Sequence, residues 1–282
     1  MSLFRYTYTT KRGSILIISM VMLSLFSILS LGMYKICNAR INLAKKMDQL
    51  IISKQAAYSM CEVTLRDLQE DSSIYHTLYE LRTPQLKTLG LAEIKYYFID
   101  EESKLNVNQA SKEQLERLDA LDEKSARNIN ESILKPYSIK EEILLVEDLE
   151  QEEYDAIKDF ITVYGEGEVN INTASEEVLL ALGMDKSLVS DIITFRAGSD
   201  GQEITEDDNI FESTGEIIQA LEDFCGLFKD DEDKLKELIS GNLLDTRGAN
   251  FLMHLDIKVK GRAAKNCDII INEDGIAEWR ED

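Results

Sequence analysis

Residues 13–34 read GSILIISMVMLSLFSILSLGMY and contain no charged side chain. Lys11 and Arg12 stand directly before this stretch, and Lys35 stands directly after it. About 20 apolar residues are enough for a helix to cross the hydrocarbon core of a membrane, because a helix rises about 1.5 Å per residue. Basic residues before the stretch favour a cytoplasmic N-terminus. The pattern therefore predicts one membrane span near the start and an exported remainder.

Three kinds of N-terminal segment fit this pattern. A secretory signal peptide has a shorter apolar core and a small-x-small cleavage site, which Ser30-Leu31-Gly32 matches only loosely. A plain signal anchor is the second alternative. In the third, the basic leader of residues 1–13 ends in Gly13 directly before Ser14 and resembles the site cut by prepilin peptidase. That resemblance implies cleavage between Gly13 and Ser14, which leaves the apolar helix on the mature protein.

The composition limits the classes of function. The chain has 282 residues, with 31 Lys and Arg against 53 Asp and Glu, and a formal net charge of −22. This is room for a span and one or two modest domains. Such a charge repels phosphate backbones, so no nucleic acid is expected as a partner. His76 and His254 are the two histidines, and no metal-ligand spacing or nucleophile motif accompanies them. We therefore expect no enzymatic activity.

Four cysteines occur, at Cys37, Cys61, Cys225 and Cys267. In an exported protein Cys225 and Cys267 could form a disulfide. Two buried thiols are the alternative, and the sequence leaves both open.

The helical pattern continues beyond the apolar stretch. From Leu43 to Leu68 apolar residues, Cys61 among them, recur at steps of three and four, and residues 33–69 contain no Gly or Pro. The sequence thus predicts one helix from about Ser14 to Glu70, roughly 85 Å long, ended by Asp71-Ser72-Ser73. A coiled-coil stalk is the alternative. Because the stripe lacks sustained heptads, we expect its second half to pack on the protein's own globular domain.

Strand patterns occur on both sides of the chain's middle. Residues 94–100 are aromatic and β-branched, whereas residues 74–91 are less regular. Residues 251–259 alternate with a period of two, and residues 267–271 and 276–280 flank a hairpin turn at Glu273-Asp274-Gly275. We expect these four strands to form a small antiparallel sheet, packed on the long helix and bracketing an all-helical insertion.

An internal repeat lies inside the insertion. LNVNQAS at residues 105–111 is echoed by VNINTAS at residues 169–175, and each copy precedes two short helices. Asn side chains satisfy turn backbone groups, and Ser or Thr caps helix amides. Ser111 with Gln114 fits a capping box, as does Thr173 with Glu176, and Ser175 is an equally suitable cap.

Each repeat resembles the helix-hairpin-helix module. The nucleic-acid-binding form of that module has a Gly-h-Gly turn whose amides approach phosphate. Here the turns read LDALD at residues 118–122 and LGMD at residues 182–185. Carboxylates repel phosphate, and a Cβ atom prevents close approach of the backbone. The turns therefore favour a structural or protein-contact role over DNA binding.

The densest group of loop carboxylates follows the second repeat. Asp200, Glu203, Asp207 and Asp208 could supply oxygen ligands to calcium. Their spacing is not that of an EF-hand, and a solvated acidic loop is the alternative.

The chain thus divides into a leader (1–13), a transmembrane helix (14–36), an amphipathic helix with the first strand (37–100), a helical insertion (101–248) and terminal strands (249–282). This α+β plan resembles the K-type minor pseudopilin of the type II secretion system. The leader and helix are features of all pilin-like proteins. The insertion with its asparagine phrases is the feature that points to the K type.

The resemblance implies a location and partners. Other pilins carry Glu at the fifth mature position, where it pairs with a neighbour's N-terminal amine, and here that position is Ile18. The resemblance therefore implies a subunit at the filament tip, with a periplasmic C-terminal domain, inner-membrane lipid around its helix and calcium in its helical domain. It also implies processing by prepilin peptidase, with methylation, and contacts with the I- and J-type minor pseudopilins and other pseudopilins. A membrane-anchored DNA-uptake protein and a plain anchored adhesive domain remain the alternatives.

Overall fold

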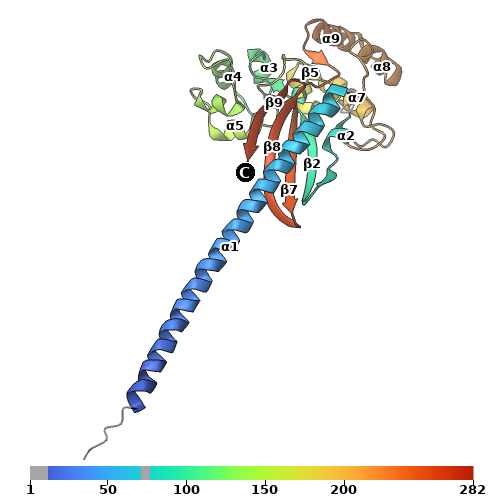
Figure 1. Ribbon diagram of the computed structural model, residues 1–282. Helices are drawn as coiled ribbons and strands as arrows, with labels where there is room; N and C mark the ends of the chain where they lie inside the picture. The colour runs from blue at the N-terminus through green and yellow to red at the C-terminus, as the bar shows by residue number, and fades with distance from the viewer. Residues whose placement is uncertain (1–11, 71–76, 282) are drawn as a thin grey trace, which may run out of the picture. The chain divides into compact units, whose positions relative to one another are not determined.

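The structure, a computed structural model, describes residues 12–70 and 77–281 (Figure 1). Most of the leader and the helix stop predicted at residues 71–73 lie outside the described residues. The chain divides into two compact units, Met1–Ile52 and Ser53–Asp282, and each is described by itself.

A single helix, α1 (Arg12–Glu70), carries the apolar stretch and its amphipathic continuation, as the sequence predicts. It is long and apolar enough to cross a membrane, and its most apolar window has a mean hydropathy of 2.5 with no buried residue. The hydroxyls of Ser19, Ser24 and Ser27 each donate to a carbonyl oxygen three or four residues earlier, at 2.8 Å. These polar groups are therefore satisfied without water, which a hydrocarbon environment requires.

The sheet of the second unit has five antiparallel strands in the order β1-β2-β7-β8-β9. They are β1 (Gln85–Leu89), β2 (Ala92–Asp100), β7 (Phe251–Val259), β8 (Arg262–Asn272) and β9 (Gly275–Glu281). Four of them are the predicted strands. The fifth, β1, was not predicted, because it is an edge strand whose largely exposed residues carry no apolar alternation. A short helix, α2 (Leu78–Arg82), precedes it.

One face of the sheet packs on the last turns of α1. The buried helix face includes Ala57, Met60, Cys61 and Thr64, and the hydroxyl of Thr64 lies 3.6 Å from the Met253 sulfur of β7. Figure 1 shows this part of α1 lying across β7 and β8. The predicted packing of the amphipathic half on the sheet is therefore confirmed.

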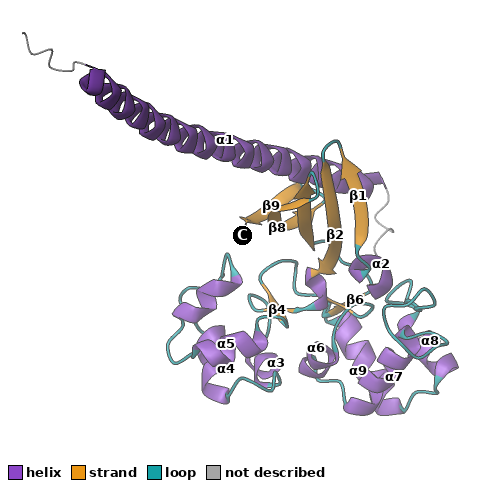
Figure 2. Cartoon of the chain, turned by 90° about the horizontal axis from the view of Figure 1, so that it is seen from below, coloured by secondary structure: helices purple, strands orange, loops and turns teal. Residues whose placement is uncertain are grey.

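The insertion lies between β2 and β7 in the chain and has a hydrophobic core of its own, contributed by both repeats. Figure 2 shows the helices of the first repeat gathered on one side and those of the second on the other. The elements of the first are η1 (Glu101–Ser103), α3 (Lys112–Glu116), α4 (Glu123–Asn130), η2 (Lys140–Leu145) and α5 (Gln151–Ile157). Those of the second are α6 (Glu176–Ala181), α7 (Lys186–Arg196), α8 (Ile217–Phe224) and α9 (Lys229–Ser240).

The insertion is not entirely helical, which corrects the prediction. β3 (Leu105–Asn106) pairs in parallel with β4 (Ile161–Thr162), and β5 (Val169–Asn170) pairs in parallel with β6 (Leu244–Asp245). Each asparagine phrase thus starts as an extended segment that pairs with the end of its own repeat. Strands of two residues are too short to produce a recognisable alternation in the sequence.

Candidate functional site

Three successive carboxylates, Asp100, Glu101 and Glu102, join the end of β2 to the insertion. Their exposed fractions are 2%, 4% and 7%. A buried carboxylate is costly unless hydrogen bonds or an opposite charge compensate it. The partners of these three side chains therefore decide how the insertion is held.

Asp100 binds the second asparagine phrase. Its Oδ2 accepts hydrogen bonds from Asn170 Nδ2 and Thr173 Oγ1, both at 2.6 Å, and its Oδ1 accepts the Glu102 amide at 2.9 Å. Burial, followed by the nearby Glu102 charge, raises the pKa of Asp100 to about 8. A Cβ atom on Gly248 would lie 2.3 Å from Asp100 Oδ1, so this position requires glycine.

Glu102 binds the chain where it returns to the sheet. Its Oε2 accepts the amides of Ala249 and Asn250, at 3.1 and 3.0 Å, and its Oε1 accepts Asn250 Nδ2 at 2.6 Å. The amide of Glu101 also donates to the Asn250 carbonyl, at 2.9 Å. The two ends of the insertion are therefore bonded directly to each other.

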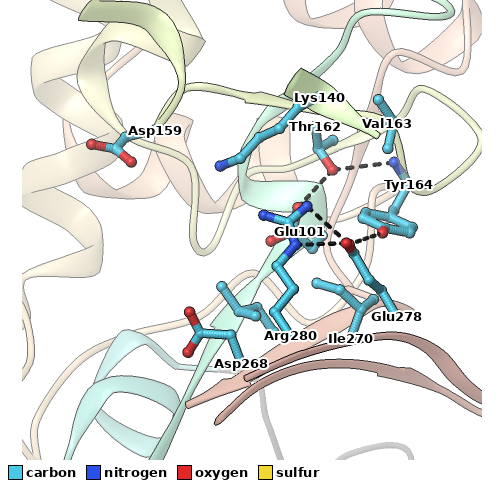
Figure 3. Close-up of a pocket in the computed structure, with 11 residues that line it drawn as sticks. Glu101, Lys140, Asp159, Thr162, Val163, Tyr164, Asp268, Ile270, Glu278 and Arg280 are labelled. Carbon is cyan, nitrogen blue, oxygen red and sulfur yellow. Dashed lines mark hydrogen bonds and ion pairs between the residues drawn. The ribbon is translucent and has the colours of Figure 1, made fainter. Parts of the chain in front are cut away.

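Glu101 binds the first repeat. Its Oε2 accepts the hydroxyl of Thr162 in β4 at 2.6 Å (Figure 3). Its Oε1 pairs with Lys104 at 2.5 Å. The three carboxylates thus contact the first repeat, the second repeat and the returning chain. We call this cluster the acidic junction.

A second connection joins the last strand to the insertion beside a hollow of about 220 Å³. Tyr164 donates to Glu278 at 2.5 Å, and Arg280 binds both Glu278 and Glu141 of η2. Lys140 projects into the hollow (Figure 3), where burial and the nearby Lys104 lower its pKa. The polar groups here connect β9 to the first repeat.

The second asparagine of each phrase acts as a clip on a distant residue. Asn108 accepts the Tyr137 amide at 2.7 Å and donates to the Tyr137 carbonyl at 3.0 Å. Asn172 accepts the Phe211 amide at 2.8 Å and donates to the carbonyls of Phe211 and Thr246, both at 2.9 Å. The repeated phrase therefore has a repeated structural role.

The first asparagine of each phrase shapes the turn. Asn106 accepts the amide of Asn108 at 2.9 Å, and Asn170 accepts the amide of Asn172 at 3.0 Å. Each of these Asn residues therefore bonds to the backbone two residues further along.

The helix caps are partly as predicted. Ser111 and Gln114 form the expected capping box. The predicted box between Thr173 and Glu176 is wrong, because the Thr173 hydroxyl donates to Asp100 instead. Ser175, the alternative, caps α6 by accepting the Val178 amide.

The carboxylates in the hairpin turns cap the helices that follow. Asp122 accepts the Ser125 amide at 2.7 Å and Asp185 accepts the Leu188 amide at 2.9 Å, and these bonds lower the pKa of each carboxyl group. A Cβ atom on Gly183 would lie 2.9 Å from the Arg117 guanidinium, which covers this turn. Each turn therefore places a carboxylate on an amide at the start of the following helix, where its charge disfavours phosphate.

The proposed calcium ligands build their own loop instead of converging on one point. Asp207 accepts the hydroxyl and amide of Ser199, and these bonds help to lower the pKa of Asp207 to about 2. Asp208 accepts the amides of Ile204 and Thr205, Glu203 pairs with the buried Arg196, and Asp200 accepts the Gln202 amide. In the described parts of the chain, no group of three or more His, Cys, Asp and Glu side chains could hold a metal ion. The four residues therefore do not fit a calcium site in this arrangement.

The sequence left open either a disulfide between Cys225 and Cys267 or two buried thiols, and in the structure no bond joins them. Cys225 follows α8 in the insertion, is exposed and donates to the Leu221 carbonyl, whereas Cys267 is buried in β8. At the N-terminus, Gly13, Ser14 and Ile18 all lie within α1, and Ile18 is exposed. Cleavage between Gly13 and Ser14 remains a prediction.

Comparison with known proteins identifies the fold. No protein-family model matches the sequence, and no curated protein matches it. Among solved structures, the chain is similar to a chain of the GspK–GspI–GspJ complex from the type 2 secretion system of enterotoxigenic Escherichia coli. The TM-score is 0.60 at 16% identity, and the match covers 86% of this chain and 97% of that chain. The pilin-like α+β fold predicted from the sequence is therefore confirmed.

Proposed function

We propose that this chain is a K-type minor pseudopilin of a type II secretion system and sits at the tip of the pseudopilus. The observation that carries the proposal is structural. An apolar helix long enough to cross a membrane continues into a pilin-like sheet with a large insertion, in a fold matched over 86% of the chain by part of the GspK–GspI–GspJ complex. A helical anchor with a globular head is what a filament subunit extracted from a membrane requires.

The tip position is supported by two features. Ile18 occupies the fifth mature position, where a carboxylate in lipid would be costly without a partner. A subunit with no neighbour above it has no amine to pair with and no need of that carboxylate. The insertion, held by the acidic junction, adds bulk to the head that fits where nothing stacks above.

The expected partners are the I- and J-type minor pseudopilins, followed by the other pseudopilins. Met47, Leu50 and Ile51 on α1 are each more than half exposed. Exposed apolar side chains of this kind are typical of an interaction surface. We propose that this row packs against the helices of the partner subunits once the chain leaves the lipid.

The proposed sequence of events begins in the inner membrane, with the N-terminus cytoplasmic and residues after the span periplasmic. Prepilin peptidase cuts between Gly13 and Ser14, and the trimmed subunit joins two other minor subunits. The assembled tip is then raised by a short filament that supports export of proteins across the outer membrane.

Processing is tested by mass spectrometry of the protein extracted from membranes. We expect the mature chain to start at Ser14. Gly13→Val should leave the leader uncut, because a branched side chain then occupies the cleavage position, whereas the neighbouring control Ser14→Ala should still be cut. A wild-type chain that starts at Met1, or beyond the apolar helix, would refute the proposed class.

Partner binding is tested by co-purification with the I- and J-type subunits of the same system. Leu50→Asp places a charge in the apolar row and should abolish recovery of the partners and secretion together. Lys45→Asp, an exposed change on the opposite face of α1, is the matched control and should retain both. Retention of partners by Leu50→Asp would contradict the packing, and a gel shift of DNA at low salt would favour the DNA-uptake alternative.

A further inference from the structure

Two buried cysteines lie near each other where α1 crosses the sheet, and no bond joins them in the structure. Cys61 lies on the buried face of α1, and Cys267 lies in β8, each with an exposed fraction of 1%. Cys267 is the register partner of Leu255 in β7, and both residues are buried. Directly opposed residues share a face of a sheet, so Cys267 points to the same side as Leu255 and Met253.

Contacts on either side of Cys61 fix its position over β8. The rings of Tyr58 and Trp279 lie 4.6 Å apart, centroid to centroid, and the Thr64 hydroxyl lies 3.6 Å from the Met253 sulfur. Trp279 in β9 and Met253 in β7 are both register partners of Ile269 in β8. The helical turn that contains Cys61 therefore crosses β8 at Ile269, and Cys267 is the next residue of β8 on the same face.

The chemistry of the pair follows from its burial. Burial, together with the nearby Cys267 thiol, raises the pKa of Cys61 to about 12. The thiolate is the reactive form of cysteine, so the Cys61 thiol is inert once the helix has docked. A bond between them must therefore form while the helix is still undocked, and afterwards it is shielded from reductants.

We propose that Cys61 and Cys267 close into a disulfide when the chain folds under oxidising conditions, fastening the helix to the sheet. Its formation in cells rests on the export described under Proposed function, because disulfides persist in the periplasm and not in the cytoplasm. The oxidant is a protein disulfide of the thiol-exchange class.

The reaction is a pair of exchanges. The Cys61 thiolate attacks one sulfur of the oxidant, forming a mixed disulfide and releasing one oxidant thiolate. The Cys267 thiolate then attacks the Cys61 sulfur and releases the second oxidant sulfur. Two electrons pass to the oxidant, and its two sulfurs take up the two protons lost by the cysteines.

A disulfide at this position suits a subunit that is pulled into the filament through its helix. The bond encloses the whole insertion and most of the sheet in one covalent loop, which restricts the unfolded chain. The oxidised protein should therefore unfold about 5 to 10 °C above the reduced protein. The head then stays on the helix when force is applied along it.

The experiment uses the full chain in detergent, refolded with a mixture of oxidised and reduced glutathione. The product is denatured in the presence of N-ethylmaleimide, which labels thiols, and its intact mass is measured by mass spectrometry. We expect two labels, on Cys37 and Cys225, four labels after reduction, and one linked peptide pair containing Cys61 and Cys267. Cys61→Ala should carry three labels without reduction, and Cys225→Ala, the matched control, should carry one and retain the link.

Four labels on the unreduced wild type, or a link through Cys37 or Cys225, would refute the pairing. A second arm traps thiols in intact cells with acid before extraction. A Cys61–Cys267 link in both arms supports the pairing and the export. A link in the refolded protein together with free thiols in cells leaves the pairing established and contradicts the periplasmic location instead.

Discussion

Replacing Asn172 with alanine removes three hydrogen bonds at once from the core of the second repeat. Its side chain is 3% exposed, accepts the Phe211 amide and donates to the carbonyls of Phe211 and Thr246. A buried backbone group left without its partner costs about 1 to 3 kcal/mol. Because the carbonyls retain a second lone pair, we take the lower part of that range and expect Asn172→Ala to cost about 3 to 4 kcal/mol.

The first repeat provides the matched control. Asn108 forms two corresponding bonds, both to Tyr137, and is only half-buried, so water replaces part of what is lost. Asn108→Ala should therefore cost about 1 to 2 kcal/mol. Asn172→Asp keeps the acceptor for the Phe211 amide but faces two carbonyl oxygens with a carboxylate, so it should be at least as harmful as alanine.

Thermal unfolding of the full chain in detergent, followed by circular dichroism, measures these differences. A loss of 3 to 4 kcal/mol corresponds to roughly 10 °C in the unfolding midpoint for a domain of this size. Hydrogen exchange at the Phe211 amide gives a local reading, since that amide should lose protection in Asn172→Ala alone. If Asn172→Ala costs no more than Asn108→Ala, the clip is not what stabilises the second repeat.

Three further changes test the junction and the acidic loop. Burial raises the pKa of Asp100 to about 8, so between about pH 4 and pH 8 the folded state binds more protons than the unfolded state. The free energy of unfolding should therefore fall as pH rises through this window, by at most about 1.4 kcal/mol per pH unit. Urea unfolding at several pH values measures this dependence, which should be weaker in Asp100→Asn. Gly248→Ala places a methyl group 2.3 Å from Asp100 Oδ1 and should lower the free energy of unfolding by about 2 kcal/mol or more. Gly215→Ala, which has no neighbour within 4 Å, is the control and should change it little. Equal unfolding midpoints for the two variants would contradict the close approach. Asp207→Ala removes the bonds to Ser199 and should lower the unfolding midpoint equally in EDTA and in calcium, and a loss seen only in calcium would restore the metal interpretation of this loop.

The large elements could be predicted because their patterns are long. An uncharged stretch, a three- and four-residue period and two-residue alternation in β2 and β7 each repeat often enough to be unambiguous. The edge strand β1 lacks that redundancy, because most of its side chains are exposed. The pairs β3–β4 and β5–β6 have only two residues per strand, so tertiary pairing, and not local preference, creates them.

The candidate site was harder to predict because burial of charge leaves no local signature. In the sequence Asp100 ends the predicted strand 94–100, and Glu101 and Glu102 follow it. Only the distant partners Asn170, Thr162 and Asn250 explain why the three side chains are buried. A usable signal was present: three acids in a row separate an apolar strand from an asparagine phrase. In the acidic loop the composition predicted a calcium site, whereas its carboxylates accept hydrogen bonds from nearby backbone amides.

The sequence also indicates which cysteines lie on facing apolar surfaces. The helical period places Cys61 on the apolar stripe, and two-residue alternation places Cys267 on the inner face of its strand. Cys225, in contrast, ends a helix of a part of the chain with a separate core. Asking which cysteines lie on facing apolar surfaces would therefore have selected Cys61 and Cys267.

The acidic junction bonds the insertion to the sheet at several points. A domain that only recruits a partner can be joined to the rest of the chain by flexible linkers, which form few hydrogen bonds. Here no spacer separates β2 from the insertion, and the returning residues Ala249 and Asn250 are bonded to Glu102. Burying three acidic side chains lowers stability relative to apolar residues of similar volume. It also fixes the orientation of the insertion, because each of the three has different partners. Such an arrangement suits a head that transmits force along its helix, and Asp100→Asn should therefore impair secretion before it impairs binding of the partner subunits. Equal loss of both in that variant would show that the junction only supports folding.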